Sequence, residues 1–513
     1  MLTNLMETIL PATGEKISEV VETPLEEIHP IYEKARNAFS DWSRLSLKDR
    51  LAYFRKLRLV MTEKMDHLAQ VISKDTGKSL TEAITADVMP TIDAILHLEQ
   101  EAPHVLKRQK MKTPLMLWGK KSYVEYMPMG VVLVISPWNY PMNLSMVPML
   151  SALVSGNTVL LKPSEVTPLV GKEIERLFHI AGFPDGVVQV VHGGKEVGAA
   201  LTEGKPDYIF FTGSVRTGKI IQQVAAKHLI PTTLELGGKD PMIVFEDAPL
   251  ERAVKGAVWG AFTNSGQVCM STERLFVHKS ILPQFVQMLK KEVANLKRGT
   301  GPNDDIGAMT YLHQVEIVKR HVEDALQKGA TLETGTPPET WDGTMFLPLM
   351  VLSNVTTDMD IVNEETFGPI LPIIPFETEE EAIQLANQSD YGLNSSVWSK
   401  DLEKAKRVAS QLVAGNVVIN DVIVSVANHH LPFGGVKHSG IGRYHGTIGI
   451  LTFCHTKSVM VDKGTKPSEI QWYPYNGKYE LFLSLFRHYF GEKRNWLGFI
   501  KDYLTLLKMT KNS

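Results

Sequence analysis

Short apolar runs that alternate with helical stretches limit the fold of this chain more than any other feature. Four of these runs are Thr158–Leu161, Val187–Val191, Tyr208–Phe211 and Thr232–Leu236. The segments between them, such as Val170–Ala181, have apolar residues at helical spacing. Continuous apolar runs are typical of strands buried on both faces, and strands that alternate with helices pair in parallel. The pattern therefore predicts a doubly wound α/β sheet.

A second set of runs predicts a second α/β domain after Gly238. Its expected strands are Met242–Val244, Arg274–Val277, Ile370–Pro375 and Val417–Ile419. Amphipathic helices are expected earlier, between Glu26 and Gln100. The length of 513 residues agrees with two or three domains, because one domain usually holds about 100–200 residues.

The composition excludes several classes of protein. With 43% apolar residues, 22% charged residues and a formal net charge of −3, the chain has no polyanion-binding character, so no nucleic acid partner is expected. Its two cysteines cannot form a disulfide framework, and no zinc-type spacing occurs, so no metal is predicted. Met1–Lys16 lacks the pattern of a signal peptide, and no apolar run has the length of a membrane span. We expect a cytoplasmic protein with a small-molecule substrate.

Two motifs contain a candidate nucleophile and a candidate base. Cys269 ends the small and polar stretch Asn264-Ser265-Gly266-Gln267-Val268. Glu235 ends an apolar approach, where burial raises the pKa of a carboxyl group unless it is paired. A thiolate can attack a carbonyl carbon, and a nearby base can activate the water that releases the product. Taken singly, each residue has a more common interpretation, a core cysteine and a solvated glutamate.

Seven motifs in order resemble the aldehyde dehydrogenase superfamily. Besides the two above, they are Pro137-Trp138-Asn139-Tyr140-Pro141, Lys162-Pro163-Ser164-Glu165, Phe211-Thr212-Gly213-Ser214, Glu365-Thr366-Phe367-Gly368-Pro369 and Pro432-Phe433-Gly434-Gly435. The resemblance implies an NAD(P)-dependent, hydrolytic enzyme that oxidises an aldehyde to a carboxylic acid. A CoA-acylating relative and a dinucleotide-binding scaffold without chemistry are the alternatives. Glu235 argues against the first, and the retained set of Cys269, Glu235 and Asn139 against the second.

The resemblance also implies a domain plan. It assigns residues 1–109 and 127–236 to a dinucleotide-binding domain and 237–436 to a catalytic domain. Residues 110–126 and 451–463 become strands of a small oligomerisation arm, and 464–513 a helical C-terminal extension. A homodimer or homotetramer is therefore expected.

The resemblance gives three residues catalytic roles. Cys269 attacks the aldehyde and carries a thiohemiacetal and then a thioester. Asn139 stabilises the oxyanion with the backbone N–H of Cys269, and Glu235 activates the hydrolytic water. Asn139 has an alternative role, because Asn is a favoured N-cap for the helix that follows. Cys454 is expected to be structural.

The cofactor site is assigned in the same way. Gly213–Lys219 is one residue short of a P-loop, and Ile220 stands where a Mg²⁺-binding hydroxyl is needed, so a nucleotide hydrolase is disfavoured. The resemblance gives cofactor contacts to Ile135, Trp138, Lys162, Glu165, Gly213, Ser214, Gly218, Leu236, Glu365 and Phe367, with Glu364 as an alternative to Glu365. Glu165 beside the adenosine ribose favours NAD, while Lys162 leaves NADP open.

The substrate is expected to be an apolar aldehyde, whether aliphatic, aromatic or isoprenoid. The resemblance places Tyr140, Asn143, Leu144, Val147, Met270 and Phe433 near the substrate tunnel. Adjacent His429 and His430 are interpreted as polar residues at the tunnel mouth rather than as metal ligands, since no third ligand accompanies them.

The segment after Asp462 lies beyond the family pattern. It contains two stretches of aromatic and aliphatic residues at helical spacing, separated by Gly491-Glu492-Lys493-Arg494. Three alternatives exist for this segment: packing on its own subunit, packing on a partner subunit, and peripheral contact with a membrane. We expect docking on protein, near the tunnel mouth or a dimer interface, because so many exposed aromatics would aggregate.

Overall fold

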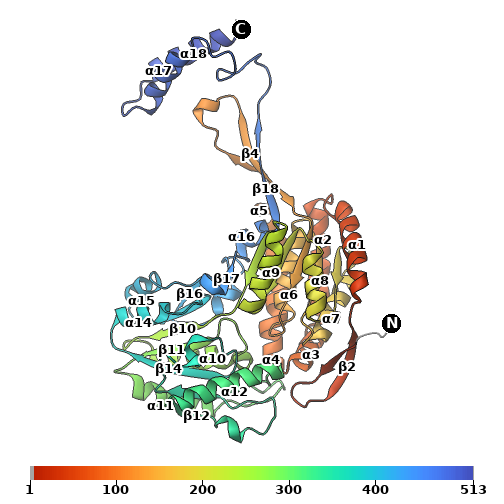
Figure 1. Cartoon of the computed structure of the whole chain (residues 1–513), viewed down its shortest axis with the longest axis vertical. Coiled ribbons are helices and arrows are strands. Elements are labelled where there is room, and N and C mark those ends of the chain that lie inside the picture. Colours follow the sequence, from red (N-terminus) through yellow and green to blue (C-terminus); the bar gives the residue numbers. More distant parts are fainter. Residues whose placement is uncertain (1–4, 512–513) are drawn as a thin grey trace. The chain divides into compact units, whose positions relative to one another are not determined.

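The computed structural model describes residues 5–511 and divides into two units (Figure 1). The larger unit comprises Tyr126–Thr456 and the chain up to Lys107, and the smaller comprises Arg108–Glu125 and the chain from Lys457.

One sheet of the larger unit has six strands in the order β17-β9-β8-β5-β6-β7. The strands are β5 (Val131–Ile135), β6 (Thr158–Lys162), β7 (Val188–Val190), β8 (Tyr208–Thr212), β9 (Thr232–Glu235) and β17 (Gly440–Ile441). All pairings are parallel except that of β17 with β9. The chain winds to one side of β5 and then to the other, so the predicted doubly wound sheet is confirmed.

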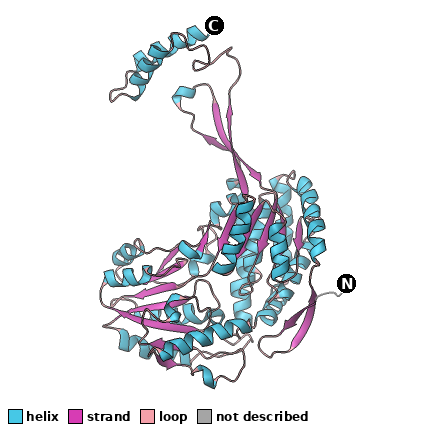
Figure 2. Cartoon of the chain, viewed as in Figure 1, coloured by secondary structure: helices cyan, strands magenta, loops and turns pink. Residues whose placement is uncertain are grey.

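Helices accompany this sheet, as Figure 2 shows. Those between its strands are α6 (Asn143–Val154), α7 (Pro168–Ile180), α8 (Lys195–Glu203) and α9 (Val215–Lys227). The expected N-terminal helices are α1 (Ile28–Trp42), α2 (Leu47–Glu63), α3 (Met65–Thr76), α4 (Leu80–Glu82) and α5 (Met89–Val105), preceded by the hairpin β1 (Leu5–Ile9) and β2 (Lys16–Val21). A π-helical turn, Ala83–Val88, joins α4 to α5.

The second sheet has seven strands in the order β12-β13-β14-β11-β10-β15-β16. The strands are β10 (Asp240–Val244), β11 (Thr272–His278), β12 (Thr331–Thr334), β13 (Met350–Ser353), β14 (Ile370–Phe376), β15 (Asn394–Trp398) and β16 (Asn416–Ile419). Its helices are α10 (Leu250–Phe262), α11 (Leu282–Ala294), α12 (Leu312–Gln327), α13 (Asp360–Asn363), α14 (Glu379–Asn387) and α15 (Leu402–Ala409), and α16 (Gly446–Leu451) follows later. Only β12 pairs in an antiparallel sense. The second α/β region is thus also confirmed.

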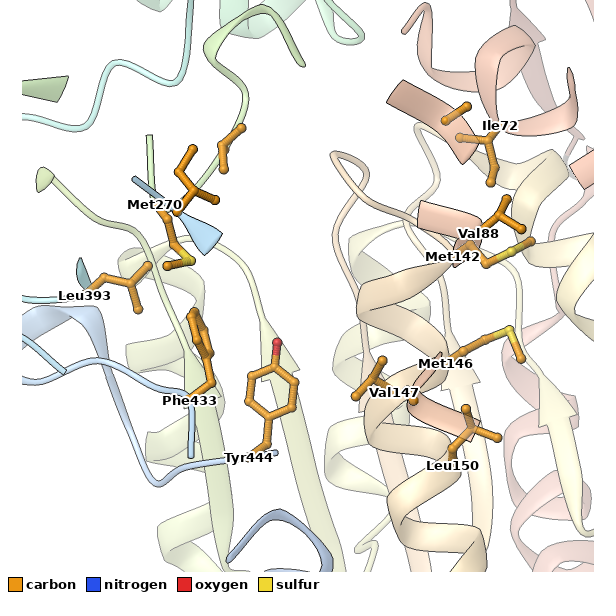
Figure 3. Close-up of a cluster of buried hydrophobic side chains, with 14 of the residues drawn as sticks. Ile72, Val88, Met142, Met146, Val147, Leu150, Met270, Leu393, Phe433 and Tyr444 are labelled. Atoms are coloured by element: carbon orange, nitrogen blue, oxygen red, sulfur yellow. The ribbon is translucent and has the colours of Figure 1, made fainter. Parts of the chain in front are cut away.

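The largest hydrophobic core runs through both sheets of this unit. Met146, Val147 and Leu150 contribute to it from α6, and Figure 3 shows Phe433 and Tyr444 on the facing side. α6 is buried on nearly all sides, and this packing fixes the position of residues 136–142, which join β5 to α6.

The smaller unit contains a three-stranded sheet in the order β18-β4-β3 and two helices. Its elements are β3 (Gln109–Met111), most of β4 (Lys121–Pro128), most of β18 (Cys454–Val461), α17 (Tyr479–Phe490) and α18 (Trp496–Lys511). Both predicted C-terminal helices are therefore present. Between residues 5 and 511, no helix has the length and apolar character needed to cross a membrane.

Candidate active site

The carboxyl ends of three neighbouring strands border one cavity of about 230 Å³. Its lining is Pro137, Trp138 and Asn139 after β5, Thr212, Gly213 and Ser214 after β8, Glu235, Leu236 and Gly237 at the end of β9, and Leu144, Cys269, Gln314, Ile317, Glu365 and Phe367. β5 and β8 are neighbours from which the chain winds in opposite directions. Such a switch point is where doubly wound sheets bind ligands.

Cys269 enters this cavity from the turn between α10 and β11. The preceding Asn264 and Ser265 have positive φ angles of 51° and 56°. A Cβ on Gly266 would lie 2.1 Å from the carbonyl oxygen of Gly368, so only glycine fits there. Burial, with the nearby carboxylates of Glu365, Asp240 and Glu235, raises the pKa of the Cys269 thiol. The resting group is therefore a thiol, and it needs a proton acceptor before it can attack a carbonyl.

Glu235 ends β9 as a buried carboxyl group with neither oxygen hydrogen-bonded. Its burial raises the pKa well above the usual value, and Arg443 opposes this only in part. A carboxylate with a raised pKa is a stronger base than a solvated one. The sequence analysis expected a raised pKa for Glu235 unless the residue was paired, and the structure shows a buried Glu235 without a hydrogen-bond partner.

Asn139 lies between β5 and α6, and its side chain is directed at the turn that holds Cys269. Asn139 Nδ2 donates to the carbonyl of Gln267 at 3.0 Å. α6 begins at Asn143 with Met142 as its N-cap, and no side chain caps it. The capping role considered for Asn139 is therefore wrong.

A buried ion pair supports Asn139, and the sequence analysis missed it. Lys78 Nζ lies 2.9 Å from Asp87 Oδ2 and donates to the carbonyl of Asn139 at 2.7 Å. Both charged side chains are fully buried. Asp87 is presented by the π-helical turn and also accepts from the backbone N–H of Asn143 at 3.0 Å. Lys78 follows the end of α3, and nothing in its local sequence signals this burial.

The segment Glu365–Phe367 is held by a second buried ion pair. Glu273 accepts from the backbone N–H groups of Thr366 and Phe367, both at 2.8 Å, and from Lys239 Nζ at 2.5 Å. Glu365 accepts from the backbone N–H of Gly238 at 3.1 Å. Burial raises the pKa of Glu365 to about 8.

Glu365, rather than its neighbour Glu364, faces the cavity. Glu364 Oε2 instead lies 2.6 Å from Arg320 and 3.3 Å from His321. The Phe367 ring meets Trp138 edge-on at 5.4 Å. The motif thus presents one carboxylate and one ring to the same space.

The N-terminus of α9 borders the cavity through Ser214. Ser214 is the N-cap of α9 and accepts from the backbone N–H of Thr217. A Cβ added to Gly218 would lie 2.6 Å from the side chain of Leu236. A Cβ added to Gly213 would lie 2.6 Å from the side chain of Phe211. These glycines let the strand and the helix N-terminus approach closely, where the helix dipole favours a diphosphate. Lys162, the last residue of β6, pairs at 2.8 Å with Glu165, which lies just after this strand.

The cavity does not collect every predicted residue. Among the cofactor candidates, Ile135, Lys162, Glu165 and Gly218 do not line it, and among the substrate candidates, Tyr140, Asn143, Val147, Met270 and Phe433 do not. Val147 instead lines a small cavity with His97, His429 and His445. Gln314 and Ile317 of α12 line the main cavity although the sequence did not point to them. Across residues 5–511, no three His, Cys, Asp or Glu side chains are arranged to hold a metal ion.

The family to which this architecture belongs follows from one comparison. The sequence model of the aldehyde dehydrogenase family matches residues 2–459. The chain belongs to the aldehyde dehydrogenase family. It is therefore an oxidoreductase that acts on aldehydes, with 464–513 lying outside the matched region.

Relatives and solved structures agree with this aldehyde dehydrogenase assignment. The chain is 44% identical over 461 residues to 4,4'-diapolycopene aldehyde oxidase from Methylomonas sp, covering 90% of this chain and 86% of that one. The NAD+ complex of aldehyde dehydrogenase from Bacillus cereus superposes with a TM-score of 0.85 at 36% identity, over 90% of this chain and 94% of that one. An NADP-dependent enzyme from E. coli superposes with a TM-score of 0.86 at 32% identity, over 90% and 95%.

Proposed function

We propose that this aldehyde dehydrogenase oxidises an apolar aldehyde to the carboxylic acid with NAD or NADP. The observation that carries the proposal is the placement of Cys269, Glu235 and Asn139 around one cavity with six of the cofactor candidates. The relative named for 4,4'-diapolycopene aldehyde supports a large apolar substrate. Leu144 and Ile317 line the cavity and suit such a substrate.

In the first step, Cys269 loses its proton and Sγ forms a bond to the carbonyl carbon. The ionised form of Glu235 is the available proton acceptor, because burial raises its pKa and so makes it a stronger base. It releases this proton before the later hydrolytic step. The aldehyde oxygen becomes an oxyanion, which Asn139 Nδ2 and the backbone N–H of Cys269 stabilise. Donors that are fixed before the charge develops contribute most to such a step.

Gly213, Ser214, Trp138, Leu236, Glu365 and Phe367 would hold the dinucleotide. When bound, its nicotinamide supplies the acceptor for the hydride that leaves the carbon attached to Cys269. The resulting thioester is hydrolysed by water that gives its proton to Glu235, and Sγ leaves as the acid forms. Glu235 fits this role because its oxygens have no other partner.

The proposal is tested by the absorbance of NADH or NADPH formed from a panel of aldehydes of increasing chain length. We expect Cys269→Ala to abolish turnover and Cys454→Ala to keep it, since Cys454 is buried at the start of β18, outside the cavity. An active Cys269→Ala variant would contradict the mechanism. Product analysis with and without CoA separates hydrolysis from the CoA-acylating alternative, and no turnover of any aldehyde would favour a scaffold.

The domain roles and the assembly complete the proposal. The six-stranded sheet is assigned to dinucleotide binding and the seven-stranded sheet to catalysis, with strands in 110–126 and 451–463 joining subunits of a homodimer or homotetramer. Sedimentation velocity of the full chain tests the assembly, and a monomer would contradict it.

A further inference from the structure

The chain ends in a helical hairpin, α17 and α18, whose two faces differ. The helices lie side by side and are joined by the turn 491–495 (Figure 1). One face closes the core of the smaller unit, where Leu485 clusters with Phe499 and Leu506. The rings of Tyr489 and Phe499 lie 5.6 Å apart across the pair. Packing within the same chain therefore covers part of the apolar residues of this segment.

Another face of the hairpin leaves large apolar side chains exposed. They are Tyr479, Phe486 and Phe490 on α17 and Trp496, Leu497, Ile500 and Leu504 on α18. Leu497 is 84% exposed and Phe490 is 72% exposed. With 3.6 residues per turn, each set falls within an arc of about 100° on its helix. We call the two sets together the apolar stripe.

Both halves of the apolar stripe lie on the same side of the hairpin. The contact line between the helices follows Tyr489 and His488 on α17 and Phe499 and Asp502 on α18. On each helix, the stripe lies roughly a third of a turn around the helix axis from this contact line. When each helix is viewed from its own N-terminus, the rotation from the contact line to the stripe has the same sense. Because the two helices run in opposite directions, an equal rotational sense places both halves on one side.

Positive charge borders the apolar stripe. Residues 464–513 contain eight Lys and Arg against four Asp and Glu, although the whole chain has a formal net charge of −3. Helical spacing places Lys501 and Lys508 at the edge of the stripe on α18. On α17 it places Arg487 at the edge of the stripe together with Glu480. Arg494, in the turn, lies 5.3 Å from the Tyr489 ring centroid. Aromatic residues with flanking cations are typical of helices that lie in the interface of an anionic bilayer.

We propose that the apolar stripe docks on the surface of an anionic lipid bilayer without crossing it. The sequence alone favoured docking on protein, but the charge distribution argues against a second hairpin as the partner, because a symmetric contact would bring the same cationic borders together. Neither helix is long and apolar enough to span a membrane. The proposal concerns the smaller unit alone and does not depend on the identity of the aldehyde.

The test is co-sedimentation of the full chain with vesicles of phosphatidylcholine, alone or mixed with phosphatidylglycerol. We expect binding to the mixed vesicles that weakens with added salt, and little binding to phosphatidylcholine alone. Leu497→Gln with Ile500→Gln should weaken binding by at least about tenfold. Lys501→Gln with Lys508→Gln should weaken it by about fivefold for each charge. The matched control is Leu229→Gln in the larger unit, where the leucine is 90% exposed, and it should bind as the unchanged chain does.

Several outcomes overturn the proposal. Absence of binding to the mixed vesicles, equal binding to both vesicle types, or unchanged binding by Leu497→Gln with Ile500→Gln each contradicts it. A smaller assembly of that variant in sedimentation velocity, with vesicle binding unchanged, would assign the stripe to a contact between copies. Turnover of a short, water-soluble aldehyde should be the same in every variant, which shows that each is folded.

Discussion

Replacing Lys78 with methionine keeps most of the side-chain volume and removes the charge that supports Asn139. The fully buried ammonium group lies 2.9 Å from Asp87 Oδ2. Removing one partner of a buried ion pair leaves the other charge uncompensated, which costs about 3–5 kcal/mol. Asp87 keeps the bond from the backbone N–H of Asn143, so we expect a loss of stability toward the lower end of this range.

The same substitution should reduce catalysis through the backbone of Asn139. Its carbonyl would lose the bond from Lys78 at 2.7 Å and keep the one from Asn264 Nδ2 at 3.1 Å. A displacement of about 1 Å in a catalytic group can cost about 10²-fold, so we expect kcat to fall by about that factor. KM for the dinucleotide should change little, because five of its six proposed ligands in the cavity, all except Trp138, come from segments other than the one after β5.

A second substitution distinguishes the effect of Lys78 on the position of Asn139, measured by kcat, from its effect on overall stability, measured by the melting temperature. Adding Asp87→Asn to Lys78→Met removes the uncompensated charge, so the melting temperature should largely recover while kcat stays low. The assays are thermal melting and steady-state NAD(P)H formation. A Lys78→Met protein with normal kcat would refute the argument, and recovery of both quantities in the double variant would leave Lys78 a purely structural role.

Three further predictions address the cavity. Glu235→Gln should slow deacylation by about 10²–10⁴ while a single-turnover burst of NAD(P)H survives, and normal steady-state turnover would remove Glu235 from the mechanism. Asn139→Ala should lower kcat by about 10²–10³, and a change confined to the melting temperature would contradict its oxyanion role. Burial raises the pKa of Glu365 from 4.5 to about 8, so between these pH values the folded protein holds a proton that the unfolded chain releases. Stability should therefore fall as pH rises through this window, and Glu365→Gln should flatten the fall in denaturant midpoints; an unchanged slope would show that another group is responsible.

Local patterns predicted many of the elements and pointed to two candidate reacting groups. The runs at Thr158–Leu161 and Tyr208–Phe211 predicted β6 and β8, because strands buried on both faces need continuous apolar side chains. Glu235 stood out since a carboxylate is costly at the end of an apolar strand. The two helices after Asp462 followed from their apolar periodicity.

Tertiary structure alone decided how distant segments support those groups. Lys78 and Glu273 look like ordinary charged residues in the sequence. Only the fold shows that each is buried and bonded to the backbone of a segment with a proposed catalytic or cofactor-binding role. Gln314 lines the cavity because α12 happens to pass it. Periodicity reports whether a side chain faces inward, which is a local property of helix and strand geometry. Which partner it meets there depends on how elements far apart in the chain pack, and no short stretch of sequence contains that information.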